Sequence, residues 1–148
     1  GELLTMDFGA LYHGYHADMT RTIAVGWISD EQRAIYETVL EAQLAALATI
    51  HAGIEGSEAD RSARRVIDAA GYGKYFVHSY GHGLGIQIHE EPYASLAGEK
   101  PLCAGAVVSA EPGIYLPGKF GVRIEDVTVI TDEGTENLTR SPKKLIIL

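Results

Sequence analysis

The chain has 148 residues, of which 46% are hydrophobic and 22% charged, a balance typical of one globular domain with its own core. A net charge of −8 argues against nucleic-acid or anionic-membrane partners, and no apolar run approaches the ~20 residues that span a bilayer. The single cysteine, Cys103, excludes an internal disulfide and fits a reducing compartment, so we expect a cytoplasmic protein.

The first predicted elements are a β-hairpin and a helix. Residues 2–11 and 15–25 are rich in Leu, Tyr, Thr, Ile and Val and flank a YHG sequence, which indicates two strands and a turn. Ser29 followed by Gln32 matches the capping-box pattern that begins a helix. Apolar residues then recur at helical spacing, and we expect this helix to stop at Gly53.

The second half of the chain predicts another helix and another hairpin. An apolar stripe indicates a helix over residues 57–70, which Gly71 would end. Residues 106–131 read as two strands around a Pro-Gly-Lys turn, and residues 143–148 as a last short strand or tail. Two hairpins that flank two helices predict an α+β fold with an antiparallel sheet.

The segment HSYGHGLGIQIHEEP, residues 78–92, contains three histidines, two glutamates and three glycines. Histidine and glutamate at this density favour a metal site or an acid–base centre. His82 is the best candidate for a metal ligand, because its glycine neighbours leave room for a cluster. His89 suits hydrogen bonding to a substrate or transition state, whereas His78 taken alone is better explained as a structural residue.

The register of the first predicted hairpin brings two carboxylates together. A turn centred between Tyr12 and His13 places Asp7 directly opposite Asp18, and a slip of one residue would remove this pairing. Like charges that face each other across a strand pair destabilise it unless a cation lies between them. Taken singly, Asp7 would be a cap or turn residue, and Asp18 would pair with Arg21.

The second predicted hairpin has the same property. A turn centred on Gly118 places Glu111 opposite Glu125. Taken singly, Glu111 could cap a loop beside Pro112, and Glu125 could be a solvated strand residue. Four carboxylates and one imidazole together predict two divalent metal ions, with Mn²⁺ first and Co²⁺, Fe²⁺ or Zn²⁺ as alternatives. We expect Glu90, Glu91 and Asp126 either to be solvated or to support the ligands from behind.

Four segments, DFG…HADMTRT, HSYGHGLGIQIHEEP, SAEPGIY and GVRIEDV, resemble the pita-bread metallopeptidases in their order along the chain. This family includes Xaa-Pro dipeptidases (prolidases), Xaa-Pro aminopeptidases and methionine aminopeptidases. The resemblance implies a pita-bread fold of which residues 1–148 are the C-terminal portion of the catalytic domain, without its upstream half and without an N-terminal domain. The chain begins without an initiator methionine, which agrees with a fragment.

The resemblance implies the identity of five metal ligands. Asp7 would hold one metal, His82 and Glu111 would hold the other, and Asp18 and Glu125 would bridge the two.

The resemblance also implies roles in catalysis and in support of the ligands. Glu111 would act as general base and then general acid, and His89 and His78 would contact the substrate. Tyr115 and Arg123 would lie behind the ligands, and strand alternation places them on the faces of the two glutamate ligands.

The sequence around the two aspartates and the short spacing between the two glutamates favour the Xaa-Pro dipeptidase branch. Xaa-Pro aminopeptidase is the next alternative, followed by methionine aminopeptidase or a non-catalytic binding protein with the same fold. We therefore expect an Xaa-Pro dipeptide or short peptide as substrate and a homodimeric protein.

Overall fold

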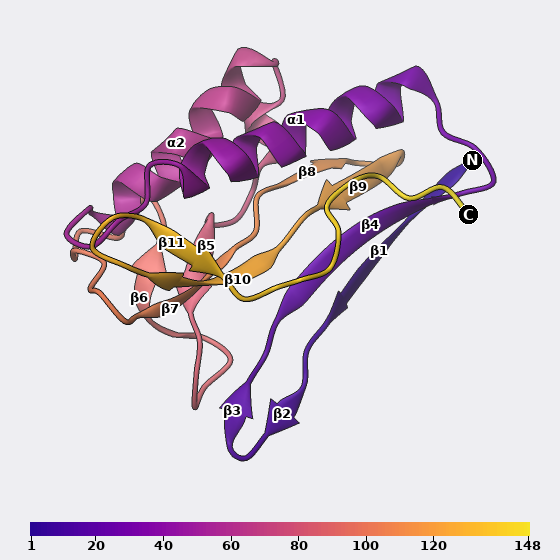
Figure 1. The fold of residues 1–148 in the computed structure, drawn as a ribbon. Helices are drawn as coiled ribbons and strands as arrows, with labels where there is room; N and C mark the ends of the chain where they lie inside the picture. The colour runs from indigo at the N-terminus through magenta and orange to yellow at the C-terminus, as the bar shows by residue number, and fades with distance from the viewer.

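The computed structural model describes all 148 residues, and it places two helices on one side of a set of antiparallel strands (Figure 1). The helices are α1 (Asp30–Leu47), α2 (Gly56–Ala69) and the short 3₁₀-helix η1 (Gly73–Tyr75). The strands are β1 (Glu2–Phe8), β2 (Leu11–Tyr12), β3 (Tyr15–His16), β4 (Met19–Val25), β5 (Gly81–Gly83), β6 (Glu90–Ala94), β7 (Val107–Ala110), β8 (Gly113–Leu116), β9 (Phe120–Arg123), β10 (Asp126–Ile130) and β11 (Thr135–Asn137). The predicted α+β class is confirmed.

Helix α1 begins where the sequence predicts and ends earlier. The Ser29 side chain accepts a hydrogen bond from the Gln32 backbone, and the Gln32 side chain accepts one from the Ser29 backbone, so the capping box is present. The predicted end at Gly53 is wrong, because the helix stops at Leu47. Beyond it, the Ala52 and Gly53 amides donate to carbonyls of distant segments, and these tertiary hydrogen bonds replace further helical ones.

The register of the second hairpin is confirmed. Strand β8 pairs with β9 so that Gly113 lies opposite Arg123, and the same register continues in the pairing of β7 with β10. Gly118 has a φ of 74°, which the third position of a type II turn requires. The short break between the two ladders is where Glu111 and Glu125 lie.

The register of the first hairpin differs from the prediction. Asp7 lies opposite Thr20 and not Asp18, because the turn is centred one residue later than expected. His13 and Gly14 form this turn with φ values of 49° and 85°, the pair of positive angles that a two-residue hairpin turn favours. Asp18 falls in the gap between β3 and β4, so it faces the other acidic residues from outside the ladder.

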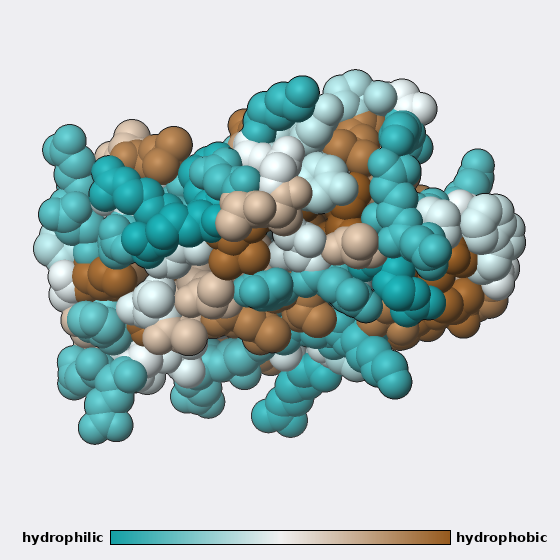
Figure 2. All heavy atoms as spheres, turned by 90° about the horizontal axis from the view of Figure 1, so that it is seen from above, coloured by the Kyte–Doolittle hydropathy of each residue, from teal (hydrophilic) through white to brown (hydrophobic).

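The core lies between the helix pair and the strands. It is a cluster of 20 buried side chains, including Val39 of α1, Ile67 of α2, Ile114 of β8 and Val122 of β9. Figure 2 looks onto the helix side, where hydrophilic side chains alternate with smaller groups of hydrophobic atoms. Neither helix combines the length and the apolarity that crossing a bilayer requires.

The C-terminal segment is held by a buried ion cluster. Asp126 is fully buried, and its carboxylate pairs with Arg21 at 2.7 Å and with Lys143 at 2.6 Å. Arg21 also donates to the carbonyls of Ser141 and Pro142. The expectation that Asp126 is solvated is therefore wrong, because it is buried against partners from β4 and from the C-terminal segment.

Strand β1 forms an open edge, since β4 is its only strand partner. Leu4 and Phe8 on this strand are 48% and 55% exposed. Unpaired backbone groups beside apolar side chains promote association between chains. We expect the 148-residue chain alone to self-associate and Leu4→Lys to reduce this association, as measured by sedimentation velocity at several concentrations. A wild-type chain that stays monomeric at all concentrations would contradict this expectation.

Candidate metal centre

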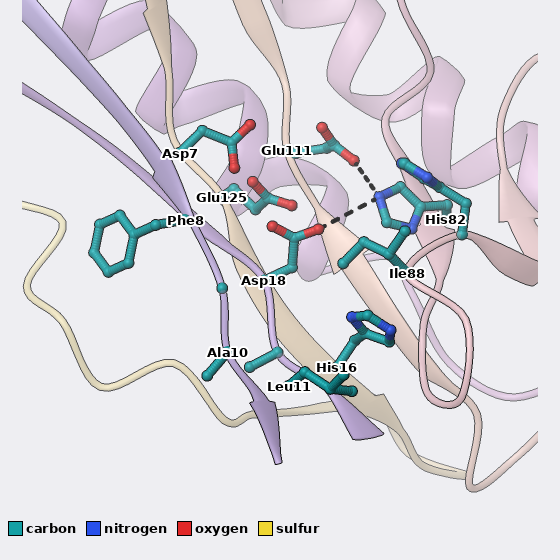
Figure 3. A pocket seen from close by; sticks show the side chains of 13 residues that line it. Asp7, Phe8, Ala10, Leu11, His16, Asp18, His82, Ile88, Glu111 and Glu125 are labelled. Atoms are coloured by element: carbon teal, nitrogen blue, oxygen red, sulfur yellow. Dashed lines mark ion pairs between the residues drawn. The ribbon is translucent and has the colours of Figure 1, made fainter. Parts of the chain in front are cut away.

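All the predicted ligands line one cleft of about 560 Å³ (Figure 3). They are Asp7, Asp18, His82, Glu111 and Glu125. Figure 3 shows their carboxylate and imidazole groups pointing toward a common space, whereas Phe8 points away from it. The structure therefore brings together side chains that are up to 118 positions apart in the sequence.

The two hairpins and strand β5 deliver these side chains. Asp7 and Asp18 come from the first hairpin, and Glu111 and Glu125 come from the break between the two ladders of the second hairpin. An isolated bridge between Thr20 and Glu125 joins the two hairpins.

His82 lies in the middle of β5 and faces the acidic group. Its Nε2 is 3.1 Å from Glu111 Oε1 and 3.9 Å from Asp18 Oδ2. Its Nδ1 is 3.0 Å from the carbonyl oxygen of Gly83, so an N–H at Nδ1 leaves the Nε2 lone pair available as a ligand. Burial opposes the charged imidazolium, but the hydrogen bonds to Glu111 and to the Gly83 carbonyl, together with the charges of Glu111 and Glu125, outweigh it and raise the pKa of His82.

Glu111 is fixed by a serine two residues earlier on the chain. Ser109 donates its hydroxyl to Glu111 Oε1 at 2.9 Å and accepts the backbone N–H of His82 at 3.0 Å. Burial favours the protonated form of Glu111, but the hydrogen bonds with His82 and Ser109 and the charge of His82 together prevail and lower the pKa of this carboxyl. Ser109 thus links strand β5, which carries His82, to the segment that carries Glu111.

The remaining carboxylates of the cleft are crowded. Burial and the nearby Glu111 raise the pKa of Glu125 to about 8, and burial together with Asp7 raises the pKa of Asp18. Ligand atoms of Asp18, His82 and Glu125 lie within 4.8 Å of one another. Oxygen and imidazole donors at this separation suit a divalent cation, which would also neutralise the excess negative charge of the carboxylates.

Asp7 belongs to a hydrogen-bonded chain that leads out of the cleft. Its carboxylate pairs with Arg123, which donates to the Tyr115 hydroxyl at 3.0 Å. That hydroxyl lies 2.8 Å from Nε2 of His78. Arg123 therefore lies directly behind Asp7, and Tyr115 lies behind Arg123. His78 is at the end of this chain and does not line the cleft.

His89 lines the cleft beside His82, and the centroids of the two imidazole rings are 4.0 Å apart. Unlike His82, it has no hydrogen-bond or ion-pair partner within the protein, and it is exposed. A ring in this position is free to contact a molecule bound in the cleft.

Sequence reasoning missed Thr20 and Ser109, which hydrogen-bond to the glutamates of the cleft. Thr20 donates its hydroxyl to Glu125 Oε2 at 2.6 Å, and Ser109 donates to Glu111. Ser109 precedes Glu111 by two positions, so strand alternation could have identified it. Thr20 could not have been identified in this way, because its partner is 105 residues away.

Comparisons with known proteins agree with this geometry. Residues 1–132 match metallopeptidase family M24. The Xaa-Pro dipeptidase of Pyrococcus furiosus is 48% identical over 146 residues, which are 99% of this chain and 42% of that protein.

Solved structures match over the same extent. An Xaa-Pro dipeptidase from Bacillus anthracis has a TM-score of 0.97 and 53% identity, over 99% of this chain and 41% of that one. An X-Pro aminopeptidase from Thermotoga maritima has a TM-score of 0.96 and 44% identity, over 99% of this chain and 42% of that one. The chain thus spans about two fifths of the length of these relatives.

Proposed function

Because the chain belongs to metallopeptidase family M24, we propose that the intact protein hydrolyses the peptide bond before proline in dipeptides, with two divalent metal ions. The family resemblance and the pita-bread fold predicted from the sequence are confirmed by the family match and by the TM-score of 0.97. The dipeptide substrate is proposed from the relatives that carry this name.

One observation carries the proposal: four carboxylates from the two hairpins and the His82 imidazole surround the same space, and no lysine or arginine lines the cleft. Arg123 binds Asp7 from behind. Asp7 would hold one ion, His82 and Glu111 the other, and Asp18 and Glu125 would bridge the two. We propose Mn²⁺ first, because carboxylate oxygens outnumber the single imidazole.

Bound divalent ions would supply a water made acidic enough to attack at neutral pH and would polarise the substrate carbonyl. Glu111 would accept the proton of the attacking water and deliver it to the departing proline nitrogen. His89 would donate a hydrogen bond to the oxygen on which negative charge develops. His78 would act from behind, by orienting the Tyr115 hydroxyl.

Removal and return of metal test the proposal on the intact protein. Exhaustive treatment with a chelator should abolish cleavage of Ala-Pro, and added Mn²⁺ or Co²⁺ should restore it. Ala-Ala should be a poor substrate under the same conditions. Cleavage of Ala-Pro that survives complete removal of metal would contradict the two-metal proposal.

An Xaa-Pro aminopeptidase is the second candidate, because a solved X-Pro aminopeptidase has a TM-score of 0.96 with this chain. Comparing Ala-Pro with Ala-Pro-Ala separates the two activities: the dipeptidase prefers the first and the aminopeptidase the second. Efficient removal of methionine from Met-Ala-Ser would favour a methionine aminopeptidase. Metal binding without hydrolysis of any of these peptides would favour a binding protein.

A further inference from the structure

Thr20 occupies the point where the two carboxylate-bearing hairpins meet. Its backbone carbonyl accepts the N–H of Glu125 at 3.0 Å, and its side chain is completely buried. Its hydroxyl donates to Glu125 Oε2 at 2.6 Å, which is the only hydrogen bond that the Glu125 carboxylate makes within the protein. The other carboxylate oxygen of Glu125 is therefore available to a cation in the cleft.

The hydroxyl of Thr20 is itself held in one orientation. Arg123 Nε donates to Thr20 Oγ1 at 3.0 Å, so the hydroxyl oxygen acts as acceptor on that side and its only proton points toward Glu125. The same guanidinium pairs with Asp7 through its NH2 group. Carboxylates of both hairpins are thus connected through one arginine and one hydroxyl.

We propose that Thr20 is a positioning residue of the metal centre: its hydroxyl, directed by Arg123, fixes the Glu125 carboxylate in the orientation that binds cations and links it to Asp7. This inference rests on the proposed function only in taking Glu125 as a metal ligand. Groups that hold a ligand in place typically change metal affinity ~10- to 100-fold when they are removed.

The β4 strand offers a matched control in Thr22. It lies two positions further along, on the same face, and is 1% exposed. Its hydroxyl also contacts Arg123, but it does so at the backbone: it donates to the carbonyl at 3.0 Å and accepts the N–H at 3.2 Å. It has no contact with a carboxylate, so Thr22→Val removes an equally buried hydroxyl and leaves the ligands in place.

The test is titration of the metal-free intact protein with Mn²⁺ by isothermal calorimetry. Thr20→Val, which keeps the shape of threonine, should raise the dissociation constant ~10- to 100-fold. Thr20→Ser, which restores the hydroxyl, and Thr22→Val should both bind Mn²⁺ as the wild type does. Circular dichroism checks the fold of each variant, and Thr20→Ala carries the same expectation if Thr20→Val does not fold.

The possible results separate the inference from the proposed function. Wild-type affinity in Thr20→Val, or an equal loss in Thr22→Val, would overturn the role of Thr20 while leaving the two-metal proposal in place. Failure of Thr20→Ser to recover Mn²⁺ binding would also overturn it. A wild-type protein that binds no Mn²⁺ would overturn both.

Discussion

His82→Ala is expected to lower metal occupancy and peptidase activity of the intact protein together. The substitution removes the only imidazole within 3.1 Å of Glu111 and leaves this half-buried carboxylate with Ser109 as its remaining partner. Even groups that only support a ligand change metal affinity ~10- to 100-fold, so loss of a ligand should reach at least the upper end of this range. Elemental analysis after dialysis and an Ala-Pro assay measure the two effects.

His89→Ala is the matched control, because it deletes the neighbouring imidazole, with a ring centroid 4.0 Å away. We expect its metal content to stay normal while kcat falls ~10²-fold or more, the loss typical of a hydrogen bond made in the transition state. If His89→Ala loses metal and His82→Ala retains it, the roles of the two histidines are reversed.

The two hairpins show why one register is predictable from the sequence and the other is not. In the second hairpin, Pro117 followed by Gly118 determines the turn type, and the register follows from it. In the first, the turn requires a positive φ at His13, a residue that adopts it less readily than glycine. Local sequence does not reveal such an angle, so the predicted centre was one residue too early.

The acidic residues lie together even though the register of the first hairpin differs from the predicted one. Asp18 lies in the gap after β3, and there it faces the cleft without a partner strand opposite. The family motifs placed the acidic residues and His82 in one group independently of the ladder, and the structure brings them to one cleft. Their assignment as ligands remains a prediction.

Long-range polar contacts are what sequence reasoning could not supply. Asp126 follows the expected ligand Glu125 directly, so alternation places it on the opposite face of the strand, where a solvated residue was expected. It is buried there because Arg21 and Lys143 reach it from β4 and from the C-terminal segment. Such pairings depend on the packing of distant segments, which no local pattern encodes.

Asp126→Asn should be among the most destabilising isosteric substitutions in this chain. The carboxylate is fully buried and compensates two cations, and Asn137 donates to it as well, at 2.6 Å. Removing one partner of a buried ion pair leaves uncompensated charge and costs about 3–5 kcal/mol. Lys143 is partly exposed and can turn toward solvent, so we expect the lower end of this range, measured by urea unfolding of the metal-free 148-residue chain at low protein concentration.

Glu31→Gln supplies the comparison, because Glu31 also pairs with a lysine at 2.7 Å, but on the surface, where both side chains are about half exposed. Surface ion pairs contribute about 0–1 kcal/mol, so this variant should unfold at nearly the same urea concentration as the wild type. Performing both measurements in chelator separates the loss of the buried pair from any change in metal binding at the adjacent Glu125. If Asp126→Asn and Glu31→Gln have the same free energy of unfolding, the buried ion pairs of Asp126 with Arg21 and Lys143 do not stabilise the fold more than a surface ion pair does, and the prediction is contradicted.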